Sequence, residues 1–235
     1  MVKVFLGVGH GGADSGAVGN GLKEKDLNLS IGLACRDVLE RHGVTVLMSR
    51  TKDENDTTSE EIKECNAFAP DLAADIHNNS EPKGTADGAE VYHTLSGGKG
   101  KTLATNINNE IIAIGQNSRG VKTRANSKGK DYYGFIRETS APAVIVECAF
   151  ISNKNDIAII DTAAEQRAMG VAIAKGILKT LGIEYKAEAE KDCRGKVITA
   201  CEFSAGTVEY LDNYKYSAEL YKALWECLRE GKKRY

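Results

Sequence analysis

The sequence predicts an α/β fold: a mostly parallel twisted sheet of about six strands flanked by helices, followed by a short C-terminal appendage. Apolar runs of strand length alternate with amphipathic stretches of helix length, which is typical of parallel strands joined by right-handed crossovers. The 235 residues are 42% hydrophobic and 27% charged, enough for one substantial core. Residues 186–191 alternate charge and alanine and indicate a linker. We therefore expect a main domain over residues 1–185 and a small unit over residues 186–235.

The N-terminal elements set the pattern for the rest of the chain. Residues 3–8 form an almost unbroken apolar run, which predicts a strand covered on both faces. Glycines around His10 follow, and residues 13–21 are so rich in turn formers that a loop is expected. This loop leads to Glu24. Apolar residues spaced three and four apart then predict an amphipathic helix with Asp26 as its N-cap.

Strands and helices continue to alternate through the main domain. Five further short runs predict strands at residues 44–48, 72–76, 89–93, 133–137 and 143–148. Helical spacing of apolar residues predicts three further helices, at residues 59–68, 101–115 and 161–181.

Two remaining regions carry weaker patterns. Residues 117–133 are polar and rich in lysine, arginine, glycine and asparagine, which predicts a surface loop. In the appendage, residues 197–203 are typical of a strand, and a helix is expected from about Ser217.

Charge and composition exclude several function classes. The net charge of −2 offers no basic surface for nucleic acid, and no apolar run approaches the ~20 residues needed to span a bilayer. The N-terminus lacks the pattern of a secretory signal, so we expect synthesis in a bacterial (host) cytoplasm. Six cysteines without a CxxC pair are expected to be free thiols.

Four polar side chains stand at the ends of predicted elements: His10, Glu24, His77 and Glu147. A parallel sheet gathers such positions at one edge, where ligands bind. Two imidazoles and a carboxylate, with a fourth position left to water, are a recurring ligand set of catalytic zinc. The remaining carboxylate suits a general base that takes a proton from water and passes it to a leaving nitrogen. The four residues therefore predict zinc-dependent amide hydrolysis.

Each of these residues also has an ordinary structural interpretation. His10 could belong to a simple glycine turn, and Glu24 could only favour the positive end of a helix dipole. His77 could be a hydrogen-bonded core histidine. Glu147 on so apolar a strand is costly unless it is paired, beside a metal or at the solvent edge, and Arg137 is a candidate partner.

Seven short motifs follow one another along residues 1 to about 183. They are Gly9-His10-Gly11-Gly12 with Asp14 and Gly16, Glu24-Lys25-Asp26-Leu27-Asn28, Arg50 with Asp53, Ile76-His77-Asn78-Asn79, Gly88-Ala89-Glu90-Val91-Tyr92, Arg119-Gly120-Val121-Lys122, and Pro142-Ala143-Val144-Ile145-Val146-Glu147 running on to Phe150-Ile151-Ser152-Asn153. In this order they resemble the zinc-dependent N-acetylmuramoyl-L-alanine amidases, the peptidoglycan-cleaving amidase type 3 family. Three positions depart from the family pattern: Lys63 where arginine is common, Asp75 in place of a usual serine, and Cys148 where glycine or leucine is frequent.

The resemblance implies His10, Glu24 and His77 as zinc ligands and Glu147 as the catalytic carboxylate. It also implies the substrate, which is the amide that joins the lactyl group of N-acetylmuramic acid to L-alanine in bacterial peptidoglycan. The polar side chains of Asn79, Arg119 and Lys122 are expected to bind this substrate. For the two basic residues, which would meet stem-peptide carboxylates, an ordinary solvated surface is the alternative.

The biological role is less constrained. A catalytic domain that begins at the N-terminus without a leader fits a phage or prophage endolysin that acts on the cell wall, although a cell's own autolysin would share this domain. A zinc exopeptidase acting on short peptides and a non-catalytic wall-binding protein are the alternative functions. The C-terminal unit is expected to bind the wall, to form a homo-oligomer or to pack on the catalytic domain.

Overall fold

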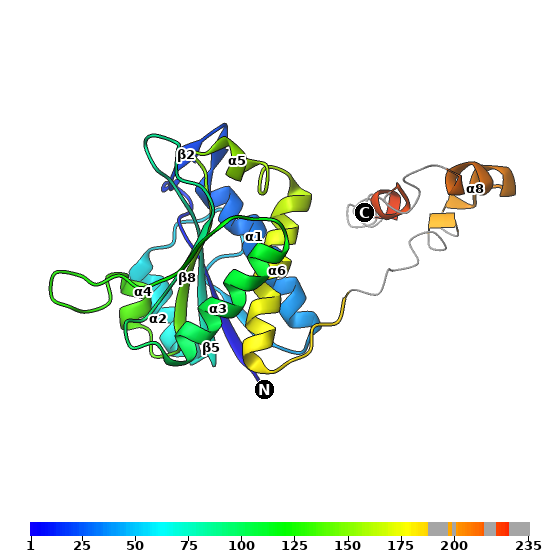
Figure 1. Ribbon diagram of the computed structural model, residues 1–235. Helices are drawn as coiled ribbons and strands as arrows, with labels where there is room; N and C mark the ends of the chain where they lie inside the picture. Colours follow the sequence, from blue (N-terminus) through cyan, green and yellow to red (C-terminus); the bar gives the residue numbers. More distant parts are fainter. Residues whose placement is uncertain (188–196, 199–200, 214–219, 226–235) are drawn as a thin grey trace. The chain divides into compact units, whose positions relative to one another are not determined.

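The computed structural model describes residues 1–187, 197–198, 201–213 and 220–225. The chain divides into two compact units, Met1–Tyr185 and Lys186–Tyr235 (Figure 1). The division falls at the start of the predicted linker. The wall-binding, oligomerisation or packing role expected of the second unit stays a prediction.

The main unit is organised around one sheet of six strands, in the order β4-β1-β5-β8-β6-β7. The strands are β4 (Thr45–Met48), β1 (Lys3–Val8), β5 (Leu72–Asn79), β8 (Ala143–Phe150), β6 (Ala89–His93) and β7 (Ser118–Lys122). Neighbouring strands run parallel, except that β6 and β8 pair antiparallel. The predicted mostly parallel sheet of about six strands is therefore confirmed.

Helices cover both faces of this sheet (Figure 1). The long helices α1 (Glu24–Arg41), α3 (Gly98–Ala113) and α6 (Ala163–Leu181) enclose the larger core on one face. The shorter α2 (Thr58–Phe68) and α4 (Gly134–Glu138) enclose a smaller core on the other. The unequal layers follow from helix length, because a long amphipathic helix buries a longer apolar stripe.

Three polar residues of the central strands, Asp75, His77 and Glu147, lie on the face of the sheet that α2 and α4 cover. Residues two apart in a strand point to the same side of the sheet. In β5, Ala73 belongs to the smaller core, so Asp75 and His77 share its side. In β8, Ala143 belongs to the same core, and Glu147 lies four residues further along the same side. The carboxyl ends of both strands thus carry polar side chains just beyond the smaller core.

Side-chain caps fix the ends of two of these helices. Thr57 and Glu60 form a capping box at the start of α2, and Thr162 and Glu165 form another at the start of α6. Gly182 ends α6 in a left-handed conformation, as predicted. Both helices therefore begin where a side chain satisfies free backbone amides, and α6 ends in a glycine turn that satisfies its last carbonyls.

Two helices, α1 and α3, start three residues earlier than predicted. α1 begins at Glu24 with Lys23 as its N-cap, so the prediction of Asp26 as N-cap is wrong. α3 covers Gly98–Ala113 rather than 101–115. The predicted loop at residues 13–21 contains the short strand β2 (Val18–Gly19), which pairs antiparallel with β3 (Leu22–Lys23) just after the loop.

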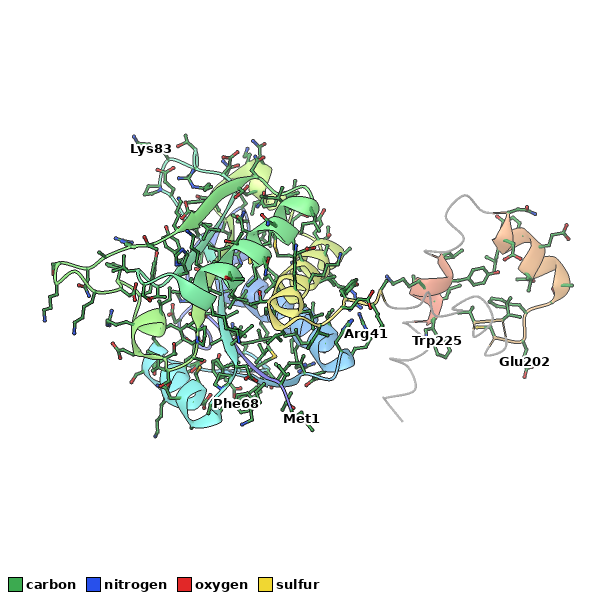
Figure 2. All side chains as sticks on the ribbon, turned by 60° about the horizontal axis from the view of Figure 1, so that its bottom comes forward. Met1, Arg41, Phe68, Lys83, Glu202 and Trp225 are labelled. Carbon is green, nitrogen blue, oxygen red and sulfur yellow. The ribbon has the colours of Figure 1, made fainter. Side chains whose placement is uncertain are left out.

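The end of α2 lies beside the start of β1. The Lys3 Nζ atom donates a hydrogen bond to the Phe68 carbonyl over 2.9 Å and lies over the Phe68 ring. Figure 2 shows Phe68 near Met1 at this end of the sheet. The contact joins the first strand to the helix that leads into β5.

The strand predicted at residues 133–137 is wrong, because this segment forms the short helix α4. Phe135 and Ile136 are both buried although they are adjacent, which a half-buried strand would not allow. Phe135 packs against Phe5, with ring centroids 6.2 Å apart. Packing on the smaller core therefore outweighs the strand propensity of Phe135 and Ile136.

The loop predicted at residues 117–133 contains the strand β7 (Ser118–Lys122). β7 stands at one end of the sheet order and pairs with β6. A polar edge strand shows no apolar run, because little of it is buried. The pattern that reveals the other strands is therefore missing here.

The small unit contains α8 (Ala205–Asp212), whose N-cap Ser204 accepts from the Thr207 amide. No helix was predicted there. The strand predicted over residues 197–203 is wrong where the structure describes it, since Val197, Ile198 and Cys201 are helical. Residues 220–225 are helical, in agreement with the helix expected from Ser217; the rest of that prediction lies outside the described residues.

Two predictions from composition can be compared with the described residues. Cys35, Cys65 and Cys148 are buried free thiols and Cys201 is also free, while the other two cysteines lie outside the described part. Among the described helices, none combines the length and the apolarity that a membrane crossing requires.

Candidate metal centre

His10 lies in the turn that follows β1. Its backbone has a φ of 64°, a left-handed conformation that is uncommon for residues other than glycine and recurs at functional sites. Its Nδ1 donates to Asp14 Oδ2 over 2.8 Å, and Nε2 lies 3.3 Å from Glu24 Oε2. The hydrogen bond with Glu24 raises the pKa of His10 above its usual value, against the effect of burial. The turn thus aims one ring nitrogen at Glu24.

Glu24 is the first residue of α1 and is buried. Its carboxylate accepts hydrogen bonds from the backbone amides of Ala17, at 2.9 Å, and Asn78, at 3.1 Å. Burial opposes its ionisation, but hydrogen bonds from His10 and His77 hold the pKa of Glu24 well below its usual range. The side chain is therefore an ionised carboxylate that faces two imidazoles.

His77 lies within β5, with its ring at 84° to the His10 ring and the centroids 5.2 Å apart. Its Nδ1 is 3.1 Å from Glu24 Oε1, and its Nε2 is 3.1 Å from Asp75 Oδ2. Burial lowers the pKa of His77, but Asp75 and Glu24 outweigh it and raise the pKa well above its usual value. The ring fills the space where a Cβ on Gly9 would stand, so this position requires glycine.

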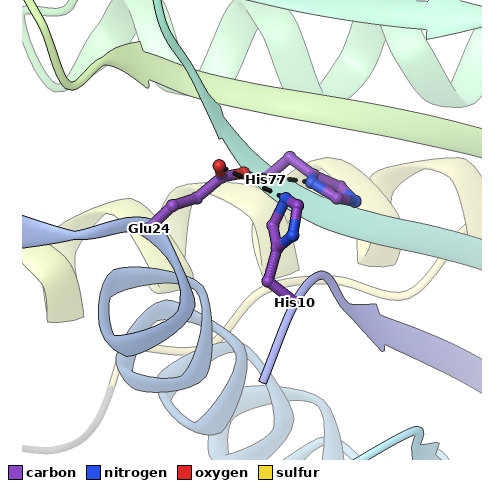
Figure 3. Close-up of side chains that lie close together, drawn as sticks. All are labelled: His10, Glu24 and His77. Carbon is purple, nitrogen blue, oxygen red and sulfur yellow. Dashed lines mark hydrogen bonds and ion pairs between the residues drawn. The ribbon is translucent and has the colours of Figure 1, made fainter. Parts of the chain in front are cut away.

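The three side chains converge on one point (Figure 3). Potential ligand atoms of His10, Glu24 and His77 all lie within 4.8 Å of one another. Two imidazole nitrogens and an ionised carboxylate form a recurring donor set for a divalent metal with an open position. In the part of the chain that the structure describes, no other group of histidine, cysteine or acidic side chains meets this spacing. These residues therefore fit a metal ion.

Glu147 lies beside this cluster, on the neighbouring strand. It pairs in register with His77 of β5 and, on its other side, with Glu90 of β6. Its Oε2 is buried and has no hydrogen-bond partner among the described residues. Burial raises the pKa of Glu147 to about 7; nearby carboxylates add to this effect and His77 opposes it. A carboxyl group that titrates near neutral pH can both accept and return a proton.

Arg137 does not serve as the structural partner of Glu147. Its guanidinium donates to the carbonyls of Asp131 and Tyr132 and to the carboxylate of Glu138. The candidate partner is thus occupied at the surface, and the burial of Glu147 calls for another explanation. Its place beside the three converging side chains supplies one.

Arg119 and Lys122 of β7 both bind the buried carboxylate of Glu90. The Tyr92 hydroxyl also donates to it, over 2.7 Å. Burial opposes ionisation, but these donors lower the pKa of Glu90. Sequence reasoning assigned the two basic residues to substrate and missed Glu90, although a carboxylate inside an apolar strand could have indicated it. The predicted substrate contact is not tested by these bonds.

Asn79 ends β5 two residues after His77. Its side-chain oxygen accepts from the Ser80 amide, and its carbonyl accepts from the Ile151 amide over 2.8 Å. The backbone at this end of β5 is therefore tied to the segment after β8. The substrate contact expected of Asn79 stays a prediction.

Arg50 holds the His10 turn against α1, a role that sequence reasoning did not assign. The residue is only 2% exposed, and its guanidinium donates to the carbonyls of Val8, Gly9 and Lys25. These bonds fix the end of β1 relative to the first turn of α1. The two elements that carry His10 and Glu24 are thereby locked together.

Comparisons with known proteins agree with this arrangement. The N-acetylmuramoyl-L-alanine amidase CwlM of Bacillus licheniformis is 35% identical over 198 residues, 80% of this chain and 74% of that protein. The endolysin of Bacillus phage SPP1 is 32% identical over 207 residues, 82% of this chain and 73% of that protein. The solved catalytic domain of CwlV, an N-acetylmuramoyl-L-alanine amidase from Bacillus (Paenibacillus) polymyxa var. colistinus, is similar in structure, with a TM-score of 0.71. It is 28% identical and covers 78% of this chain and 100% of that domain.

A family match covers most of the main unit. Residues 4–179 match the N-acetylmuramoyl-L-alanine amidases, and this range contains the three converging side chains and Glu147. The resemblance drawn from the motifs is thus confirmed over the same part of the chain. A matching sequence profile, relatives at this level of identity and a shared fold lead to one conclusion: the chain belongs to the N-acetylmuramoyl-L-alanine amidase family.

Proposed function

We propose that this protein is a zinc-dependent hydrolase that cleaves the amide between N-acetylmuramic acid and L-alanine in bacterial peptidoglycan. One observation carries the proposal: in a member of this family, His10, Glu24 and His77 converge within 4.8 Å of one another. The peptidoglycan substrate follows from the family. Zinc is favoured over harder cations because two of the three donors are imidazoles.

The proposed ligands are His10, Glu24 and His77. The nitrogens that face Glu24 are Nε2 of His10 and Nδ1 of His77. Asp14 and Asp75 contact the opposite nitrogen of the His10 and His77 rings, respectively, which leaves the facing nitrogens available to a metal. A zinc ion bound there would supply Lewis-acid chemistry, which makes water more acidic and polarises a carbonyl group.

Glu147 is the proposed general base and acid. Its unpartnered Oε2 accepts a proton from the attacking water and returns one to the alanine nitrogen as the C–N bond breaks. The water oxygen becomes part of a new lactyl carboxyl group, and L-alanine gains a free amino terminus. The ordinary alternative for Glu147, a structural ion pair with Arg137, has no support in the described contacts.

Asn79, Arg119 and Lys122 are the proposed substrate-binding residues. Arg119 and Lys122 retain side-chain exposures of 39% and 31% while they bind Glu90. Each can therefore offer further hydrogens to a stem-peptide carboxylate. Through Glu90, which pairs in register with Glu147, both cations lie near the proposed base.

We also propose that the protein acts on the cell wall as an endolysin. The similarity to the SPP1 phage endolysin supports this role, and the similarity to Bacillus amidases supports the alternative, a cellular autolysin. Expression inside a bacterium with and without a membrane-permeabilising protein tests the endolysin role. Lysis is expected only when the membrane is opened.

The decisive test of the bond class uses purified peptidoglycan and mass analysis. The full chain loaded with zinc should produce new L-alanine amino termini without new reducing sugar ends, and a chelator should stop the reaction. New reducing ends would contradict the proposal. Release of free amino acids from short peptides, with the wall left intact, would instead select a zinc exopeptidase.

A further inference from the structure

Asp75 contacts His77 on the side away from the converging donors. The two residues are two apart in β5 and therefore share one face of the sheet. Asp75 Oδ2 lies 3.1 Å from His77 Nε2, and the Asp75 side chain is only 3% exposed. The contact is thus a buried feature on the far side of the His77 ring from Glu24.

The chemistry of the contact fixes the hydrogen on His77. An ionised carboxylate only accepts hydrogen bonds, so the Nε2 atom must donate. A neutral imidazole then carries its single hydrogen on Nε2 and presents the lone pair of Nδ1. Nδ1 is the atom that faces Glu24, at 3.1 Å. The bond therefore selects the tautomer in which the donor atom points toward the metal centre.

The surroundings hold the Asp75 carboxylate in place. Its Oδ1 is buried without a hydrogen-bond partner among the described residues, and so is Oε1 of Glu61 in α2. Both oxygens crowd the position that a Cβ on Gly7 would take. The absence of a side chain at Gly7 thus leaves room for the two carboxyl groups between β1 and α2. Packing therefore confines the Asp75 side chain. Among the described residues, His77 Nε2 is the group that forms a hydrogen bond with its carboxylate.

The other histidine shows a contrasting arrangement. His10 Nδ1 donates to Asp14 Oδ2 over 2.8 Å, but the Asp14 side chain is 67% exposed. Water can replace that carboxylate at little cost, whereas it has little access to Asp75. The buried contact should therefore matter more for the ring that it orients.

We propose, on the basis of the proposed zinc function, that Asp75 is a positioning residue that holds His77 in the tautomer with Nδ1 as the metal donor. Such outer contacts to metal-binding histidines typically change metal affinity by roughly 10- to 100-fold. Asp75 therefore tunes zinc affinity without touching the metal or the substrate.

The test measures zinc affinity by competition with a chelator, using the full chain. Asp75→Asn and Asp75→Ser should bind zinc roughly 10- to 100-fold more weakly than the wild type. Asp71→Asn is the matched control: Asp71 is exposed just before β5, accepts from the Lys3 amide, and should leave zinc affinity unchanged. Thermal unfolding of each metal-free variant checks that it folds.

A spectroscopic measurement on the wild type removes any dependence on variant folding. In zinc-loaded protein labelled with ¹⁵N-histidine, His77 should show a protonated Nε2 and a metal-bound Nδ1. A metal-bound Nε2 would overturn the inference, as would a folded Asp75→Asn protein with wild-type zinc affinity. Failure of the wild type to bind zinc would instead overturn the proposed function itself, so the two failures are distinguishable.

Discussion

His77 and Glu147 occupy register-paired positions on the adjacent parallel strands β5 and β8. Side chains at paired positions extend from the same face of a sheet, so the proposed base stands next to a proposed ligand. The residues just before this pair are buried and paired in the same register, Asp75 with Ile145 and Ile76 with Val146, which fixes both strands up to this point. Preorganisation of the base thus comes from the sheet rather than from a loop.

Replacement of Glu147 by glutamine should abolish proton transfer while metal binding continues. Glutamine has nearly the same shape but cannot accept the proton, so kcat should fall by roughly 10²- to 10⁴-fold. Turnover of purified peptidoglycan and zinc content by elemental analysis measure the two properties. Glu138→Gln is the matched control, because Glu138 is an exposed residue that pairs with Arg137. Wild-type turnover by Glu147→Gln would remove this residue from the mechanism.

Zinc should stabilise the folded protein, and a chelator should reverse the effect. A ligand that binds only the native state adds about 2.7 kcal/mol at a concentration of about 100 times its Kd. His77→Ala should lose this increment, whereas His42→Ala at the end of α1 should retain it. Thermal unfolding with and without zinc measures the increment. An unchanged transition in the wild type would argue against a metal centre.

The stabilisation of the folded protein by zinc should become smaller as the pH falls. The pKa values of His10 and His77 are raised in the metal-free folded protein. Protonation of these rings therefore stabilises the metal-free folded protein below pH 6.5, the pKa of an unfolded histidine. This stabilisation is lost as the pH rises through the folded pKa values. Zinc must displace these protons, and its affinity should therefore increase with pH. Calorimetry in two buffers of different ionisation enthalpy should reveal proton release.

Activity should decline on the acidic side of neutrality. Glu147 must be ionised to act as a base, and burial raises its pKa to about 7 in the metal-free protein. A nearby cation favours the carboxylate, so the acidic limb of kcat/KM should lie at about pH 7 or lower. Glu90→Gln removes a neighbouring negative charge and should move this limb to lower pH. If the acidic limb of the Glu90→Gln profile stayed at the wild-type pH, the limb would report the titration of a group other than Glu147.

Much of the fold could be predicted because most of its strands are buried. The apolar runs of β1, β4, β5, β6 and β8 are visible in the sequence, and their alternation with helices indicates a parallel sheet. The edge strand β7 and the short helix α4 lack such runs or periodicity. Long-range packing of Phe135 on Phe5 decides the second case, and no local pattern reveals it.

The candidate site likewise contains residues that the sequence predicts and residues that only the structure reveals. The motifs around His10, Glu24 and His77 predict a metal centre, and the structure brings these side chains together. The contacts of Arg50 join it to Val8, 42 positions away, and those of Glu90 depend on the position of β7. Supporting contacts of this kind arise from tertiary structure, so sequence spacing alone does not indicate them.

The pair Arg119 and Lys122 should contribute to substrate binding. Alanine at both positions should raise KM on purified peptidoglycan, since the exposed hydrogens of both cations are lost. Glu90→Gln keeps both cations but removes their partner, and therefore separates substrate binding from neutralisation of Glu90. Alanine at both Lys128 and Lys130, exposed positions in the loop that follows, is the charge-matched control. An unchanged KM in the double variant would reject the substrate contact.

Asp156 of the short helix α5 (Lys154–Ile157) should stabilise the strands on either side of it. Its buried carboxylate accepts from the amide of Gly88, just before β6, and from the amide of Phe150, at the end of β8. Asp156→Ala leaves both amides without an acceptor, so the free energy of unfolding should fall by about 3 kcal/mol. Asp156→Asn should lose less, because its carbonyl oxygen can still accept a hydrogen bond.

Denaturant unfolding of the metal-free protein measures these differences without a contribution from zinc. Asp161→Ala is the control, since Asp161 is exposed beyond α5, and its effect should stay within about 0.5 kcal/mol. An Asp156→Ala protein as stable as this control would show that the two amides find other acceptors. If that stable variant nevertheless lost activity, the loss would indicate a displacement of Glu147, which lies three residues before Phe150 in β8.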